Sequence, residues 1–426
     1  MSVTLAACEI AALFSRRTIL MGKLLNFEYS TIHGTYWMYY GIMTSFASVF
    51  LLGVGYSNAQ IGTILAVGNV VAAVLQPIVA DIADRSKRIT LTGILELLII
   101  LLMAMTALLF VFRKESMALS ILYVMLVGWL MIVQPLINSL NFKLQECGYH
   151  VNFGLTRSMG SLAYAVMCAI MGYIVEAHGI MTLPLTGEVI LVMFMISVIL
   201  TRNQYVKAKK ANFGDAEPSA AEAEAARGED IDLKSFVARN KMFIVMNVGV
   251  VGIFFSNAVL NSFMIQIAEN IGGNSADMGT IMGFMAFLEI PAMVYFDRLN
   301  KKVSCATLLK ISSIGFTAKI LACFLSTSVT MLVASMSLQV VSFGLFLPAI
   351  VHYINEIMSK GEAVKGQAFY TTMVTVTTVF ANFAGGFILD ASGVWMLLLV
   401  STILTAIGTG IMIITVDKIG KHEEEQ

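Results

Sequence analysis

The chain has 426 residues, of which 58% are hydrophobic and only 13% are charged, and its formal net charge is zero. This balance excludes an ordinary soluble domain, and the zero net charge gives no indication of a nucleic-acid partner. The five cysteines are scattered, with no CxxC or Cys/His spacing. We therefore expect no metal site, no disulfide framework and no cofactor.

Apolar runs of about twenty residues, the length that a helix needs to cross a bilayer, recur along nearly the whole chain. The sequence thus predicts an all-α membrane protein with twelve transmembrane helices. In chain order, the predicted spans cover residues 34–55, 59–82, 89–112, 117–144, 154–177, 183–201, 242–269, 276–297, 303–325, 328–357, 366–389 and 393–416.

One long polar segment interrupts this series after the sixth span, and it contains a stretch rich in alanine and glutamate. Such a composition is typical of a solvated tether between two six-helix bundles. The predicted organisation is an N-terminal segment (1–30), an N-terminal bundle (31–201), a linker (202–241), a C-terminal bundle (242–417) and a tail (418–426).

A signature occurs once in each bundle. The first copy reads Gly62-Thr63-Ile64, then Leu75-Gln76-Pro77, then Asp84-Arg85. The second copy reads Gly279-Thr280-Ile281, then Leu288-Glu289-Ile290-Pro291, then Asp297-Arg298. The repeat predicts two pseudo-symmetric halves, and helical membrane proteins built this way are most often transporters with the site between the halves.

Basic residues gather in every second loop, which sets the orientation of a membrane protein. The alternate loops carry only Arg113 and Lys114. We expect a plasma-membrane protein with both termini and the linker in the cytoplasm. The residues that define the cytoplasmic loops are Arg16, Arg17, Lys23, Arg85, Lys87, Arg88, Lys143, Arg298, Lys301, Lys302, Lys360, Lys365, Lys418 and Lys421.

The two six-helix halves, the long linker and the repeated Asp-Arg loops resemble the major facilitator superfamily. That resemblance implies that the loop charges pair with neighbouring helix ends and close the cytoplasmic side. The family favours glycine four residues before the first loop aspartate, where this chain has Ala80. The alternative to a gating role is that the charged loops only set the topology. The implied gating residues are Asp84, Arg85, Arg88, Asp297 and Arg298.

The segment from Asn152 to Gly160, followed by Tyr164, is similar to the lactose permease group of oligosaccharide–proton symporters. The resemblance implies that Arg157 holds sugar hydroxyls and that Tyr164 stacks on the sugar ring. Gln134-Pro135-Leu136-Ile137-Asn138 resembles the preceding helix of that group, with Asn138 in place of a sugar-binding glutamate. Glu289 and Lys319 stand where the group has an acid on helix eight and a base on helix nine.

This chain also departs from that group. Asn257 stands near the place where the group has an aspartate on helix seven. The buried ion pairs of the group are therefore absent from this chain, both partners together. The histidine and glutamate that carry the proton on helix ten align with Gln339 and Ser342. Proton coupling through that helix-ten carboxylate is therefore not available here.

Four charged candidates fall clearly inside predicted spans, where each charge costs several kcal/mol and so requires a reason. Glu289 replaces Gln76 of the first half and can carry a proton, accept sugar hydroxyls, or both. Lys319 is expected to pair with Glu289 and to act as a switch, the alternatives being a static pair or a lysine that reaches the surface. Glu96 is expected to make a helix–helix hydrogen bond.

Arg157 lies one turn into the fifth span, so reaching back to the cytoplasmic surface is an alternative to binding substrate. Aromatic residues from Tyr36 to Tyr40 open the first span. They form an interface belt in one interpretation. In the other, Tyr36 or Tyr40 faces the cavity and stacks on a sugar.

These patterns favour proton-coupled import of an oligosaccharide or glycoside by alternating access. The alternatives are a symporter for nucleosides or another polar metabolite, a proton-coupled drug exporter, and a sensor derived from a transporter. HExxH, GxSxG and paired-aspartate motifs are absent from the spans, so we expect no enzyme. The expected partners are a small polar substrate such as a sugar, protons and the lipid bilayer, with the chain as a monomer.

Overall fold

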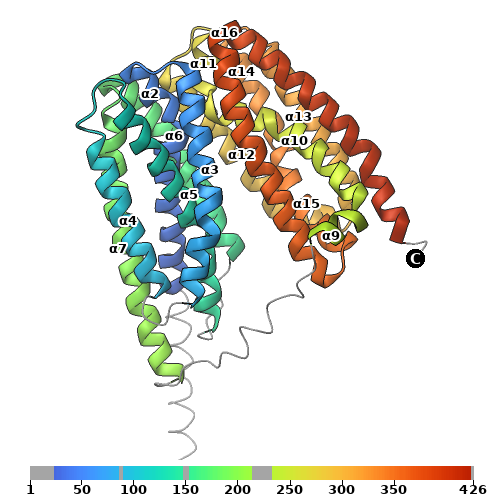
Figure 1. The fold of residues 1–426 in the computed structure, drawn as a ribbon, viewed down its shortest axis with the longest axis horizontal. Helices are drawn as coiled ribbons and strands as arrows, with labels where there is room; N and C mark the ends of the chain where they lie inside the picture. Colours follow the sequence, from blue (N-terminus) through green and yellow to red (C-terminus); the bar gives the residue numbers. More distant parts are fainter. Residues whose placement is uncertain (1–23, 86–89, 147–152, 214–232, 424–426) are drawn as a thin grey trace, which may run out of the picture.

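A computed structural model describes residues 24–85, 90–146, 153–213 and 233–423. In these ranges every regular element is helical. Figure 1 shows two groups of helices that meet at the end carrying α2 and α11 and diverge towards the end carrying α9. The all-α membrane fold predicted from the sequence is confirmed.

The first group is formed by the N-terminal half of the chain. After a helix over residues 24–40, its elements are η1 (Gly41–Ser45), α2 (Ala47–Val54), α3 (Asn58–Arg85), α4 (Leu91–Leu108), α5 (Met117–Glu146), α6 (Phe153–His178) and α7 (Thr182–Phe213).

The second group is formed by the C-terminal half. Its elements are α9 (Leu233–Arg239), α10 (Lys241–Ser262), α11 (Met264–Glu269), α12 (Ser275–Asn300), α13 (Cys305–Phe324), α14 (Val329–Ser335), η2 (Met336–Gln339), α15 (Phe343–Ile357) and α16 (Lys360–Glu423).

Ten helices of the described residues are long and apolar enough to cross a membrane. The bent pair Leu24–Ser45 and Ala47–Val54 adds a further span. The segment Glu362–Lys418 has 57 residues, far more than the roughly twenty that one crossing needs. Gly393 has φ 74° and breaks that segment into two spans. The described helices therefore accommodate the twelve predicted crossings.

Three of the predicted spans are interrupted between their ends. The first contains the π-helical turn η1, where Gly41 packs against the side chains of Tyr164 and Cys168. The seventh breaks at Phe263, and the tenth is replaced by α14, η2 and α15. Hydropathy gives no signal for such breaks, and discontinuous helices are typical of transporter binding sites.

The helix of the sixth span does not stop at residue 201 as predicted, because α7 continues to Phe213. Five of the twelve residues of this extension are lysine or alanine, which favour helix, and the start of the predicted linker is helical. Its end is helical too, over α9. The rest of the linker lies outside the described residues.

An ion pair joins two helices inside the N-terminal half. Nη1 of Arg202 on α7 lies 2.8 Å from Oε2 of Glu96 on α4. The helix–helix bond expected for Glu96 is confirmed, and the pair explains how this charge is tolerated inside the bundle.

Glycines allow α10 and the second part of α16 to pack backbone against backbone. A Cβ on Gly408 of α16 would lie 2.5 Å from the carbonyl oxygen of Gly249 on α10. Two residues further along α16, a Cβ on Gly410 would meet nothing within 4 Å. These two glycines form a matched pair for testing the packing.

Gly408→Ala is expected to lower the stability of the protein by about 1–3 kcal/mol, because the extra methyl group forces the two helices apart. Gly410→Ala is expected to leave stability unchanged or to raise it slightly, because alanine favours helix more than glycine does. Thermal unfolding of the two purified variants checks the prediction. Equal midpoints would contradict it.

Candidate functional site

A cavity of about 470 Å³ lies between the two halves. The N-terminal half lines it with the first helix, α3, α5 and α6, and the C-terminal half with α10, α12, η2, α15 and α16. Most of its wall is apolar, with polar groups at a few positions, as is typical of a small-molecule site. The charged and amide side chains in the wall are Asn69, Gln134, Arg157, Asn257, Asn261, Glu289, Gln339 and Asn382.

Arg157 brings a positive charge into the cavity from α6. Its guanidinium carbon lies 4.2 Å from the ring centroid of Trp37, and Nη1 donates a hydrogen bond to Ser161 Oγ at 3.1 Å. Arg157 therefore points inwards and does not reach back to the membrane surface. Because a guanidinium carries five N–H donors, these contacts leave it capable of binding a ligand as well.

Aromatic rings form the wall beside Arg157. The rings of Trp37 and Tyr40 lie 4.9 Å apart, and Tyr164 lies 6.4 Å from each of them. A hydrogen bond of 2.7 Å between the Tyr164 and Ser45 hydroxyls fixes the ring of Tyr164. The sequence interpretation includes Tyr40 and Tyr164 in the site, and both line the cavity.

Trp37 belongs to the interface belt in the sequence interpretation, although it stacks on Arg157 and lines the cavity. A signal for this role is present in the sequence. Trp37, Tyr40 and Thr44 follow one another at spacings of three and four residues, which places them on one face of a helix. All three line the cavity.

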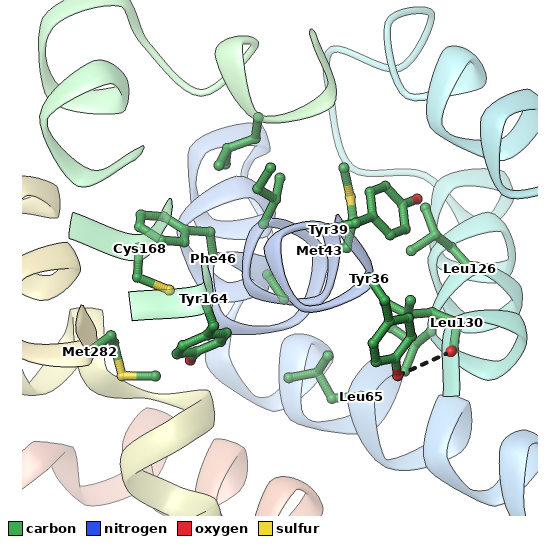
Figure 2. Packing of buried hydrophobic residues seen from close by; sticks show 14 of the residues in the cluster. Tyr36, Tyr39, Met43, Phe46, Leu65, Leu126, Leu130, Tyr164, Cys168 and Met282 are labelled. Carbon is green, nitrogen blue, oxygen red and sulfur yellow. Dashed lines mark hydrogen bonds between the residues drawn. The ribbon is translucent and has the colours of Figure 1, made fainter. Parts of the chain in front are cut away.

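Two of the predicted substrate-binding residues, Tyr36 and Asn138, do not line the cavity. Tyr36 is fully buried, and its hydroxyl donates to the carbonyl of Leu130. Figure 2 shows Tyr36 directed towards Leu130, on the side of the helix away from Tyr164. On α5 the lining residues are Val127, Met131 and Gln134, and Asn138, one turn beyond Gln134, does not line the cavity.

Glu289 brings a negative charge into the same cavity from α12. Its Oε1 accepts a hydrogen bond of 2.8 Å from Gln339 Nε2, and Gln339 Oε1 accepts one of 2.7 Å from Lys319 Nζ. Lys319 is fully buried. The direct pairing of Lys319 with Glu289 expected from the sequence is therefore wrong, because the amide of Gln339 stands between them.

Gln339 lies in η2, at the break of the tenth span. An amide has a donor and an acceptor at opposite positions, so one side chain can satisfy both a carboxylate and an ammonium group. The amide thereby satisfies two charges that would otherwise be strongly unfavourable inside the membrane. The sequence marks Gln339 only as a departure from the symporter pattern, because its role depends on the break in the helix.

Gln339→Leu is expected to lower stability by about 3 kcal/mol, because it leaves a buried ammonium group without its acceptor. Gln134→Leu is the matched control, since Gln134 is an amide in the same cavity wall but is not part of this chain of bonds. Thermal unfolding of the purified variants measures the difference. An equal loss in the two variants would contradict the role of Gln339.

Four of the five predicted gating residues belong to the ends of helices, Asp84 and Arg85 to α3 and Asp297 and Arg298 to α12. Asp297 and Arg298 are exposed, and the Arg298 guanidinium carbon lies 5.4 Å from the ring centroid of Tyr295 on the same helix. The side chains of Asp84 and Arg85, and the whole of Arg88, lie outside the described residues. Gating by these five residues stays a prediction.

The comparison with protein families decides the class of this molecule. Residues 29–407 match the model described as MFS_1 like family. The chain belongs to this family. It is therefore a multi-pass membrane protein and a transporter of the major facilitator type.

A curated relative is the uncharacterized transporter YwbF of Bacillus subtilis (strain 168), which is 22% identical over 368 residues. That match covers 83% of this chain and 84% of the relative. Among solved structures, the nucleoside transporter NupG has a TM-score of 0.68 at 13% identity, with 93% of this chain and 99% of that chain covered.

A bacterial homologue of the human lysosomal transporter Spinster, solved in an inward-facing and unoccupied conformation, has a TM-score of 0.67 at 13% identity. The match covers 94% of this chain and 98% of that chain. At these identities the likeness to both structures establishes the fold alone.

Proposed function

We propose that this transporter imports an oligosaccharide or glycoside together with protons, by alternating access. The observation that carries the proposal is the pair of opposite charges in one cavity, Arg157 from the N-terminal half and Glu289 from the C-terminal half. Sugar hydroxyls both donate and accept hydrogen bonds, so they complement a guanidinium on one side and a carboxylate on the other.

The aromatic wall supports the same substrate class. Trp37, Tyr40 and Tyr164 present flat surfaces next to the Arg157 donors. The apolar face of a sugar ring packs on such surfaces while the hydroxyls at its edge reach the charged groups. A cavity of about 470 Å³ has the size of a typical small-molecule site.

The proton is proposed to bind at Glu289, which faces the cavity and is the carboxylate in its described wall. In its charged form Glu289 accepts the hydrogen bond of Gln339, which in turn accepts that of Lys319. Protonation removes the charge that orients this amide. The chain of bonds can then rearrange, which links the proton to the relative positions of α12 and η2.

The basic loops support an orientation in which the diverging ends of the two halves face the cytoplasm. Lys301 and Lys302 follow α12 at the end where the two halves diverge in Figure 1. The excess of basic residues assigns that end to the cytoplasm. With this orientation, the cavity is proposed to belong to an inward-facing state.

A nucleoside is the second candidate substrate. It is favoured by the likeness to NupG and by the amides in the wall of the C-terminal half, Asn257, Asn261 and Asn382. An amide can pair in two places with the N–H and C=O edge of a nucleobase. The charged and amide lining does not favour a drug exporter, whose substrates are largely apolar.

A ligand screen tests the substrate class. The purified protein is heated with disaccharides, aryl glycosides, nucleosides or free nucleobases, and the shift in the unfolding midpoint is recorded. Glycosides are expected to raise the midpoint by mass action. They are also expected to accumulate in proteoliposomes when an inward proton gradient is imposed, which a sensor would not do. Shifts by nucleosides alone select the second candidate, and no shift by either class contradicts both.

A further inference from the structure

The glycines that open the two copies of the repeat, Gly62 and Gly279, do not line the cavity. They lie one helical turn into α3 and α12, at the end where the halves meet. Each of these two helices packs against a helix of the opposite half, α3 against α16 and α12 against α6. Each copy of the repeat therefore contains a glycine at a contact between the halves as well as a predicted cytoplasmic loop.

The first of these contacts is a backbone contact between α3 and α16. A Cβ on Gly62 would collide with the carbonyl group of Asn382, and a Cβ on Gly386 would collide with that of Asn58. Gly62 and Gly386 are thus required for the close approach of the two helices. Any side chain at either position would push the halves apart at this end.

The second contact repeats this arrangement between α12 and α6. A Cβ on Gly279 would collide with the carbonyl of Cys168, and a Cβ on Gly172 would lie 2.5 Å from the carbonyl oxygen of Ser275. The Cβ of either glycine would also approach the Cα of the other, within 3.0 Å. The two contacts are related by the pseudo-symmetry of the halves.

A carboxylate follows each contact by one helical turn and binds the first turn of the helix it faces. Four residues after Gly386, Asp390 accepts hydrogen bonds from the backbone N–H groups of Asn58 (3.1 Å) and Ala59 (2.8 Å). It also accepts one from the Asn58 side chain at 2.9 Å. The N-terminus of α3, which belongs to the N-terminal half, is thus capped by an acid of the C-terminal half.

The same bond occurs in the other contact with the halves exchanged. Four residues after Gly172, Glu176 accepts a hydrogen bond of 3.2 Å from the backbone N–H of Ser275. Here an acid of the N-terminal half binds the first turn of α12 in the C-terminal half. In both contacts the capped residue also precedes a repeat glycine by four positions, Asn58 before Gly62 and Ser275 before Gly279.

We propose that Asp390 and Glu176 are a symmetric pair of latches that hold this end of the transporter closed by capping helix N-termini across the two halves. The bonds are charge-assisted and lie at the positive ends of helix dipoles, so they favour the closed arrangement. Alternating access requires both caps to separate. The pair thereby sets how often the protein opens at this end, whatever the substrate is.

Accessibility of a buried cysteine tests the latches without substrate or protons, so the result is independent of the proposed transport function. Ser48 is fully buried, and its hydroxyl donates to the carbonyl of Ser262 in the other half. Ser48→Cys provides the reporter thiol, and its alkylation by maleimide is followed by mass spectrometry of the purified protein. Adding Asp390→Asn and Glu176→Gln is expected to accelerate labelling roughly tenfold, because the amide oxygens accept weaker hydrogen bonds that are no longer charge-assisted.

Two controls separate opening of the latches from general loosening. Asp277 accepts a hydrogen bond of 3.1 Å from the backbone N–H of Asn274, which caps α12 within one half. Asp277→Asn is expected to leave the labelling rate unchanged. Cys323 is buried inside the C-terminal half, and its labelling should stay slow in every variant.

The proposal is overturned if the reporter thiol of the double variant is labelled at the parent rate, if Asp277→Asn accelerates labelling as much, or if Cys323 reacts faster in parallel. Asp390→Asn and Glu176→Gln alone are smaller changes, and each is expected to give a part of the acceleration. They provide the same readout should the double variant fail to accumulate.

Discussion

Glu289→Gln is expected to abolish accumulation of the substrate against its gradient while preserving its exchange across the membrane. A proton that enters through a potential of 100 mV gains about 2.3 kcal/mol, enough for roughly fiftyfold accumulation. Glutamine keeps the size of the side chain and its place beside Gln339 but cannot carry a proton. The expected accumulation in the variant is therefore none above equilibrium.

Proteoliposomes with an imposed proton gradient measure accumulation, and counterflow without a gradient measures exchange. Glu188→Gln is the matched control, because Glu188 is a carboxyl group of α7 that does not line the cavity. It is expected to retain fiftyfold accumulation to within about a factor of two. Uphill uptake by the Glu289→Gln variant would contradict the assignment of Glu289 as the proton site.

The pH dependence of uptake provides a second readout of the same residue. In a proton-coupled importer, uptake rises as the external pH falls, because the proton site on the outward-facing side is filled more often. Glu289→Gln removes this site, so exchange in the variant is expected to be independent of pH over the range in which uptake by the parent responds. Retention of the parent profile would assign the proton to another group.

Much of the fold could be predicted because the bilayer imposes one rule on the whole chain. Apolar runs of sufficient length must be helices, and their number and order follow from counting them. The breaks at η1, at Phe263 and at η2 could not be predicted, because they keep the same apolar composition as an intact helix. They depend on packing between segments far apart in the sequence.

The candidate site could be predicted where a residue type is unusual for its surroundings. Arg157 and Glu289 are charges in apolar spans, and both line the cavity. Tyr36 and Asn138 are residues of ordinary type whose placement depends on helix rotation, which hydropathy does not fix. The link through Gln339 could not be predicted, because a neutral amide in a broken span has no sequence signal of its own.

The two copies of the repeat agree at some positions and differ at others. The repeat is the same in both halves at Gly62 and Gly279, where each half makes the same close contact. It is broken at Gln76 and Glu289, where only the second half carries a charge. Gln76 donates to the backbone carbonyl of Met131 within its own half, whereas Glu289 faces the cavity. In the two proposals made above, opening involves the symmetric positions and proton coupling involves the asymmetric one.

Arg157→Ala is expected to weaken substrate binding by roughly 10- to 150-fold, the loss that corresponds to hydrogen bonds from a charged group worth about 1.5–3 kcal/mol. Arg157→Lys is expected to recover only a small part, because an ammonium group has neither the planar fork of donors nor the stacking on Trp37. Isothermal calorimetry with the ligand identified by the thermal screen measures both dissociation constants.

The control for a lost cation is Arg239→Ala, since Arg239 is exposed on α9 and pairs with Glu362 at 3.4 Å, away from the cavity. It is expected to leave the dissociation constant unchanged. The two variants of Arg157 also separate geometry from charge. If lysine restores full affinity, position 157 contributes only charge and the fork of donors is irrelevant. If alanine binds as tightly as the parent, the substrate does not contact Arg157 and the sugar site must lie elsewhere in the cavity.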